Sequence, residues 1–248
     1  EWMDVSFIRD EALAYDGQYA ILGGDWSPFW HDALDLLTFA GLSYKMYDNP
    51  EFVDALLGRI VDYYFGVSQR IFDAASDVID IFFIGNDFGG QRGPLLSEGM
   101  FRRFLLPHLE RLVDLGHAYH LKVMLHCCGG VYELLEHLID AGLDAINPVQ
   151  IACRGMDSMV LKREFGDRLS FFGGGIDNEV LSFITADSGV PNRGLSEDGS
   201  GVDTDQIIVA LDYQQKIDQI AVDDFPATGA DLRGDIPKPI HHEPGLFL

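Results

Sequence analysis

The sequence has 248 residues, of which 47% are hydrophobic and 23% charged, so it can bury the core of one large domain or two small ones. Its 17 basic and 40 acidic residues give a net charge of −23, and a surface of this sign repels nucleic acid and anionic lipid. No apolar run approaches the roughly 20 residues that span a bilayer, and the first residues lack the profile of a signal peptide. Three cysteines are too few for a disulfide framework. The composition therefore predicts a cytoplasmic protein with reduced thiols that binds neither nucleic acid nor membranes.

Five short apolar runs divide the chain, and each run ends in small or polar residues. Longer amphipathic stretches separate the runs, and this alternation is typical of a parallel sheet with crossover helices. The sequence therefore predicts the α/β class, with polar groups gathered where each strand ends. The runs cover residues 19–22, 78–84, 121–125, 145–146 and 169–172.

Three helices have start signals in the sequence. Ser27, Asn49 and Ser97 each supply a side-chain oxygen that can cap a first turn, and a proline directly follows the first two. We therefore expect a helix to begin at each of these positions. The helix that begins at Ser97 should kink or restart at Pro107, because proline lacks an amide hydrogen.

Apolar side chains recur along two of these helices. In residues 51–75 they fall at spacings of four, four, four and one, which form a single stripe. The helix after Ser97 has a comparable face. We expect both sets of side chains to be buried in the core. The first set is Phe52, Leu56, Ile60, Tyr64 and Phe65, and the second is Phe101, Phe104, Leu105, Leu109 and Leu112.

The composition changes near residue 184. From there the chain is acidic and rich in proline and glycine, and residues 196–201 form its most linker-like stretch. We therefore expect a folded region over residues 1–183 and a loosely organised segment over residues 184–248.

His126 and Cys128 lie two residues apart at the end of an apolar strand. A strand alternates its side chains between two faces, so these two point the same way while Cys127 points to the other face. Imidazole and thiolate are ligands that zinc prefers, and a catalytic zinc needs a third protein ligand and an open position. The residues by themselves also fit a buried cysteine beside a hydrogen-bonded histidine. The residues alone therefore fit two interpretations, a metal site and a purely structural His–Cys pair.

Polar side chains follow the other predicted strands as well. In a parallel barrel the carboxyl ends of the strands collect catalytic groups from several strands, so polar residues that converge there are candidates for a site. Taken singly, Asp and Asn in such loops also serve as caps and turn formers. The glycines at 173–175 lack the spacing of a nucleotide-binding loop, and the histidines at 241–242 are expected to be solvated. The strand-end candidates are Asp25, Asp87, Asn147, Gln150 and Asp177.

Four ordered segments carry a family resemblance: FIGNDFGGQRGPLLS at 83–97, LHCCGG at 125–130, GLDAINPVQ at 142–150 and FGGGID at 172–177. Together they resemble the uroporphyrinogen decarboxylase superfamily, which includes zinc-dependent methyltransferases that act on methylated corrinoids. The likeness covers about residues 19–181 and implies a (β/α)8 TIM-type barrel within residues 1–183, with its site at the carboxyl ends of the strands. Five strand-end units stand where eight are expected, so the resemblance implies a barrel that is incomplete at its N-terminus.

The His-x-Cys-Gly element resembles the methyltransferase branch of this superfamily, whose zinc ligands it matches at His126 and Cys128. Decarboxylases carry instead an N-terminal arginine motif and an early aspartate, and neither has a match here. The methyltransferases add a later cysteine ligand, whereas no cysteine follows Cys153 in this chain. Cys153 can take that place only if the loop after Gln150 folds back over the strand that ends at His126.

The resemblance therefore implies an enzyme in which zinc on His126 and Cys128 binds a thiol and a corrinoid carries the methyl group. Asp87 and Asp177 would be the catalytic carboxylates that orient the substrate or a metal-bound group. The expected partners are a small-molecule substrate, a corrinoid protein and a second copy of the chain. Substrate contacts are expected from Asp25, Asn147, Gln150 and Arg92.

Two other functions compete with methyl transfer. The first is a metal-free decarboxylase in which Asp87 stabilises a protonated pyrrole and several arginines hold the carboxylates of a tetrapyrrole. The second is a non-catalytic barrel fragment, whose open sheet edges would pair with another chain and give a homodimer. The arginines available to the decarboxylase are Arg92, Arg102, Arg103 and Arg154.

Overall fold

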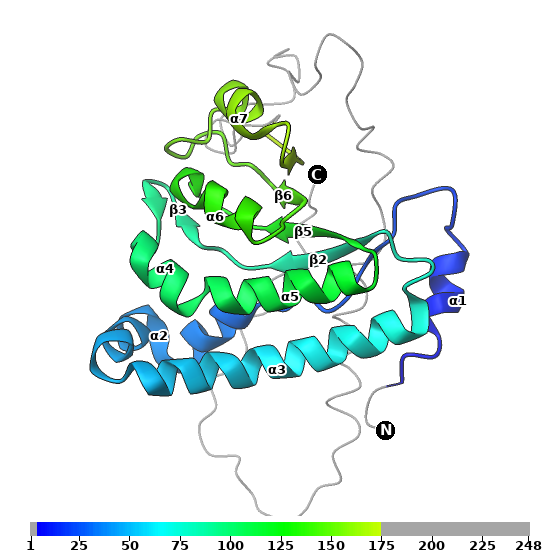
Figure 1. The fold of residues 1–248 in the computed structure, drawn as a ribbon, viewed down its shortest axis with the longest axis horizontal. Coiled ribbons are helices and arrows are strands. Elements are labelled where there is room, and N and C mark those ends of the chain that lie inside the picture. The colour runs from blue at the N-terminus through cyan, green and yellow to red at the C-terminus, as the bar shows by residue number, and fades with distance from the viewer. Residues whose placement is uncertain (1–3, 175–248) are drawn as a thin grey trace, which may run out of the picture. The chain divides into compact units, whose positions relative to one another are not determined.

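The computed structural model of the chain describes residues 4–174 (Figure 1). The predicted segment 184–248 lies outside this range, as does the last part of region 1–183. Within residues 4–174 the secondary structure follows the predicted alternation of strands and helices. The elements are α1 Ile8–Leu13, β1 Leu22–Gly23, α2 Phe29–Asp48, α3 Pro50–Ala75, β2 Ile81–Gly85, β3 Gly89–Gly90, β4 Gly93–Pro94, α4 Glu98–Phe104, α5 Leu106–Ala118, β5 Lys122–His126, the 3-10 helix η1 Tyr132–Leu134, α6 Leu135–Asp140, β6 Ala145–Asn147, α7 Ser158–Phe165 and β7 Ser170–Phe171.

Five of the strands form one parallel sheet in the order β1-β2-β5-β6-β7. Each of them pairs with the next one along the chain, and helices cross between them, as in the sequential β/α units of a barrel. The prediction of an α/β fold with a parallel sheet is therefore confirmed. The two remaining strands, β3 and β4, form a short antiparallel hairpin after β2.

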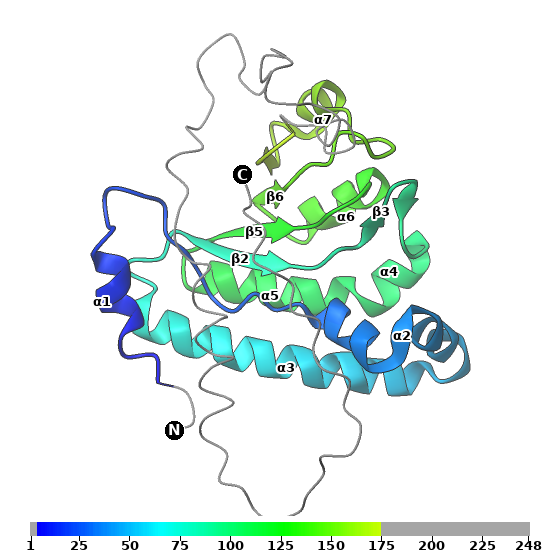
Figure 2. The same ribbon diagram turned by 180° about the vertical axis from the view of Figure 1, so that it is seen from behind.

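The core lies between this sheet and the helices α3 and α5, which the two opposite views show on the same side of β2 and β5 (Figures 1 and 2). Phe72 of α3 packs edge-on against Phe82 of β2, with ring centroids 5.0 Å apart. Alternate strand residues face these helices and are fully buried. They are Phe82, Ile84, Val123, Leu125 and Ile146.

Two of the three predicted helix caps are confirmed. The Asn49 side chain accepts a hydrogen bond from the Phe52 amide, and the Ser97 side chain accepts one from the Met100 amide. The prediction for Ser27 was wrong, because α2 begins only at Phe29. The Ser27 hydroxyl instead donates to the Asp25 carbonyl at 2.9 Å and helps to close a buried turn between β1 and α2.

The break at Pro107 is confirmed, since α4 ends at Phe104 and α5 begins at Leu106. All five residues of the apolar face predicted after Ser97 are buried. The stripe predicted on α3 was wrong by one position, because Val53 and Leu57 are fully buried whereas Phe52 is 42% exposed. A spacing of four fits both neighbouring rows of a helix, and packing against the sheet selects the row of smaller aliphatic side chains. Of the described helices, none combines the length and the apolar character needed to cross a membrane.

Candidate metal centre

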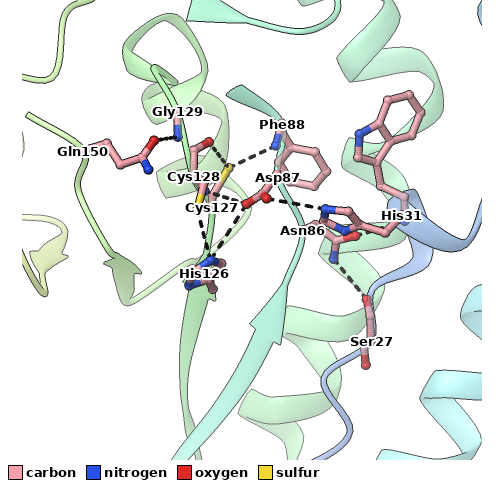
Figure 3. Close-up of polar contacts among 11 residues, drawn as sticks. Ser27, His31, Asn86, Asp87, Phe88, His126, Cys127, Cys128, Gly129 and Gln150 are labelled. Atoms are coloured by element: carbon pink, nitrogen blue, oxygen red, sulfur yellow. Dashed lines mark hydrogen bonds and ion pairs between the residues drawn. The ribbon is translucent and has the colours of Figure 1, made fainter. Parts of the chain in front are cut away.

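The register of the parallel sheet aligns the ends of three strands. His126 ends β5 and lies level with Gly85 of β2 and with Asn147, the last residue of β6. Asp87 follows β2 by two residues, and Cys128 follows β5 by two residues. Because parallel strands end at the same edge of a sheet, these side chains converge there, as Figure 3 shows.

Three potential metal ligands meet at this edge. The Cys128 Sγ lies 3.3 Å from the His126 Nε2, and the Asp87 Oδ1 lies 3.9 Å from the same nitrogen. All three donor atoms lie within 4.8 Å of one another. Tetrahedral zinc with bonds of about 2.0–2.3 Å separates its ligand atoms by roughly 3.3–3.8 Å. The distance between the Cys128 Sγ and the His126 Nε2 falls in this range, and Asp87 would have to move closer to join them as a ligand.

The His126 ring is oriented by its neighbour on the sheet. The Asn147 Nδ2 donates to the Phe172 carbonyl, which leaves the Asn147 Oδ1 facing the His126 Nδ1 at 2.8 Å. This contact places the ring proton on Nδ1 and leaves the lone pair of Nε2 directed at Cys128 and Asp87. Metal-ligating histidines are held in this way by an acceptor on their other nitrogen. Trp26 also packs against the ring, with its ring centroid 5.3 Å from that of His126.

Asp87 is tied to the loop after β5. Its Oδ1 accepts a hydrogen bond from the Cys128 amide at 2.6 Å, and its Oδ2 lies 3.5 Å from the His31 Nε2. Partial burial alone would raise the pKa of Asp87, but the His31 contact, the Cys128 amide and His126 outweigh it and lower the pKa. The carboxylate is therefore ionised at neutral pH and available as an anionic ligand.

The two adjacent cysteines lie in different environments. Cys127 is buried on the other side of the strand, where its sulfur accepts a hydrogen bond from the Phe88 amide at 3.2 Å, so the prediction that it faces away from Cys128 is confirmed. Burial, followed by the charge of Asp87, raises the pKa of Cys128 to about 12. Without a cation the site therefore holds a thiol at neutral pH, and metal binding must displace its proton.

Backbone contact between glycines holds the two loops together. Gly130 donates its amide to the Gly90 carbonyl at 2.9 Å, and a Cβ on Gly129 would lie 2.3 Å from the carbonyl carbon of Gly89. The Gly129 amide donates to the Gln150 Oε1 at 2.6 Å. The loop carrying Asp87 and the loop carrying Cys128 are therefore in direct backbone contact, with no room for a side chain at Gly129.

The structure brings some of the predicted substrate residues to this edge and leaves others apart. Asn147 and Gln150 are adjacent to the three potential ligands. Their side-chain oxygens already accept hydrogen bonds from within the protein, from His126 and from the Gly129 amide respectively. Arg92 is exposed at the turn between β3 and β4. Asp25 is buried in the turn before α2, where its Oδ1 accepts the Ser27 amide at 2.9 Å, and burial raises its pKa. Asp177 lies outside the described residues.

Cys153, which the sequence offered as a possible third zinc ligand, does not belong to the group of three potential ligands. The loop after Gln150 contacts the turn between β3 and β4, because the Arg154 amide donates to the Gln91 carbonyl at 3.1 Å. The buried Cys153 thiol points to the Gln91 Oε1 at 3.3 Å and the Gln150 Oε1 at 3.6 Å. Among residues 4–174 the third donor beside His126 and Cys128 is instead Asp87, which the sequence predicted in an orienting role.

His31 was missed by sequence reasoning. It lies in the first turn of α2, and its ring points at Asp87 from the side opposite His126 (Figure 3). A single histidine near a helix start carries no pattern of its own. Its position shortly after the end of β1 was the one available signal, since that is where strand-end loops place functional groups.

A sequential parallel sheet with polar residues at its carboxyl edge defines an α/β protein. Residues 6–173 match the family described as uroporphyrinogen decarboxylase (URO-D), and the chain belongs to this family. Among solved structures, a methyltransferase from Methanosarcina mazei is similar, with 19% sequence identity and a TM-score of 0.46. The match covers 67% of this chain and 45% of that one, so this chain spans less than half the length of the methyltransferase. No curated protein matches the chain.

Proposed function

We propose that this chain is a zinc-dependent enzyme that moves a methyl group between a corrinoid and a thiol, with Asp87, His126 and Cys128 as the zinc ligands. The observation that carries the proposal is the distance of 3.3 Å between the Cys128 Sγ and the His126 Nε2. A carboxylate oxygen of Asp87 lies within 4.8 Å of both atoms. Imidazole and thiolate favour zinc over magnesium or calcium, which take oxygen ligands. Three protein ligands leave a fourth position open for a substrate.

A zinc ion bound there would stabilise the thiolate form of a substrate thiol, which is the nucleophile that a methyl transfer from cobalt requires. The protein residues prepare the site for that chemistry. Asn147 fixes the tautomer of His126, and the Cys128 amide fixes one oxygen of Asp87. Gln150 holds the Gly129 amide and with it the loop that carries Cys128. Asp177 stays a predicted catalytic residue, and the corrinoid would be free or carried by a partner protein.

Metal content tests the proposal directly. Purified full-length chain is expected to hold about one zinc per molecule, and methyl transfer from methylcobalamin to a thiol should fall to background after chelation and return with added zinc. The measurement is elemental analysis beside the loss of the methyl–cobalt absorption band. Methyl transfer that continues unchanged in protein shown to be free of metal would remove zinc from the mechanism.

Arg92 is proposed to contact an anionic group on the substrate. It is exposed on the hairpin that follows Asp87, and among residues 4–174 it has no acidic partner, whereas Arg103 and Arg168 each pair with a carboxylate. We expect Arg92→Ala to raise the KM for 3-mercaptopropionate about tenfold and to leave the KM for the uncharged 2-mercaptoethanol unchanged. Steady-state kinetics with the two thiols compares them, and equal effects on both would contradict the assignment.

The chemistry of a metal-free decarboxylase has less support. A tetrapyrrole with several carboxylates needs several free cations around it, but Arg103 pairs with Asp54 at 2.6 Å and Arg102 lies 3.7 Å from Glu98, which leaves only Arg92 and Arg154 of the four arginines predicted for this role. Asp87 also faces His126 and Cys128, a setting that suits a metal ligand better than a carboxylate facing a protonated pyrrole. Homodimerisation through open sheet edges stays a prediction.

A further inference from the structure

Asp87 has a different neighbour at each of its two oxygens. The Oδ1 faces His126 and accepts the Cys128 amide, while the Oδ2 faces the His31 Nε2 at 3.5 Å (Figure 3). A carboxylate can turn about its last bond and bind a cation through one oxygen or both. A donor on the Oδ2 side restricts that rotation and leaves the Oδ1 for the cation.

The backbone next to this pair is fixed by a second contact between the same two segments. Asn86, directly before Asp87, is fully buried, and its Oδ1 accepts the amide of Trp30, directly before His31, at 3.0 Å. The Asn86 Nδ2 donates to the Ser27 carbonyl at 3.0 Å. The end of β2 and the start of α2 are thus joined one residue away from the Asp87–His31 contact. The placement of His31 opposite Asp87 is therefore built into the fold.

The surroundings of the His31 ring decide which nitrogen carries the proton. Its Nδ1 is buried and has no hydrogen-bond partner within the described residues. A buried N–H without an acceptor is less tolerable than a buried lone pair without a donor, so the proton belongs on Nε2. This tautomer directs an N–H at the Asp87 Oδ2.

We propose that His31 is a positioning residue that holds Asp87 as a monodentate metal ligand, a role that rests on the zinc site proposed above. His31 itself binds neither metal nor substrate. Hydrogen-bonding partners behind metal ligands contribute about 10–100-fold to metal affinity. The sequence around His31 and the family match assign it no function.

Cobalt(II) and zinc affinities of the full chain test this role. His31→Ala is expected to weaken binding of both metals about 10–100-fold in competition with a chromophoric chelator, and to change the visible d–d bands of the bound cobalt. His31→Gln keeps an N–H donor at the position of Nε2 and should recover most of the affinity. The matched control is His137→Ala, which removes a histidine paired with Glu98, a carboxylate outside the metal group, and should leave affinity and spectrum unchanged.

A double substitution shows whether His31 acts through Asp87. If it does, His31→Ala in an Asp87→Asn background should cost no further affinity, whereas independent effects would add. Additive losses, or a His31→Ala variant that binds both metals like the wild type while Asp87→Asn is weakened, would overturn the role of His31 and leave the metal site standing. A wild-type chain that binds neither metal, or that binds them equally well after Asp87→Asn, His126→Ala or Cys128→Ser, would instead overturn the proposed function.

Discussion

Cys128→Ser is expected to lower zinc affinity by more than about 100-fold and to abolish methyl transfer, with little change in stability. Serine keeps the size of the side chain but has no thiolate, and a lost ligand costs more than the 10–100-fold of a partner behind a ligand. Cys128 is only half-buried, so the exchange of sulfur for oxygen disturbs little packing. The effect should therefore be on the metal and not on the fold. Competition titrations with zinc and a thermal unfolding curve of the metal-free protein measure the two separately.

The neighbouring cysteine provides a matched control. Cys127 is 1% exposed and points to the other face of the strand, where it accepts the Phe88 amide. Cys127→Ala should keep full zinc affinity and lose about 1–3 kcal/mol of unfolding free energy, because a buried amide loses its acceptor. The opposite pattern, with zinc lost at position 127 and kept at position 128, would mean that the wrong face of the strand has been assigned to the metal.

The placement of His126 and Cys128 on one face could be predicted because it depends only on local geometry. A strand alternates its side chains, and Cys128 follows the last residue of the strand, His126, by two positions. The convergence of His126 with Asn147 was also predictable in outline. Parallel strands end at the same edge of a sheet, and the observed register pairs these two residues directly. The sequence therefore predicts that these side chains lie together at one edge of the sheet.

The roles within the site could not be predicted in the same way. Asp87 and Cys128 lie 41 residues apart along the chain, and their contact through the Cys128 amide depends on how two loops cross. His31 comes from a third segment, whose position is set by the buried side chain of Asn86. Such contacts depend on tertiary packing that leaves no periodic signal. The error on α3 has a related origin, since Phe52 and Val53 belong to rows with the same spacing and only packing distinguishes them.

The crossing of the two loops leads to the second large effect, which is expected for Gly129→Ala. Gly129 has a φ of +86°, where a side chain is strained, and its new Cβ would lie 2.3 Å from the Gly89 carbonyl carbon. The backbone fixes the position of the Cβ, and the carbonyl carbon belongs to the main chain, so a side-chain rotation cannot relieve the clash. The two loops must separate, and the Asp87 carboxylate then moves away from the Cys128 amide. We expect a loss of about 3 kcal/mol or more in unfolding free energy, together with weakened zinc binding.

A glycine without close neighbours shows how much of this effect comes from the contact. Gly58 lies inside α3, and a Cβ there would meet no atom within 4 Å. Gly58→Ala should therefore stabilise the protein by up to about 1 kcal/mol, because alanine favours the helix. Thermal unfolding of the two variants should shift in opposite directions, down by roughly 6–12 °C for Gly129→Ala and slightly up for Gly58→Ala. If Gly129→Ala unfolds like the wild type and binds zinc normally, the close approach of the loops does not hold the ligands together. The positions of Asp87 and Cys128 would then have to depend on the strand ends alone.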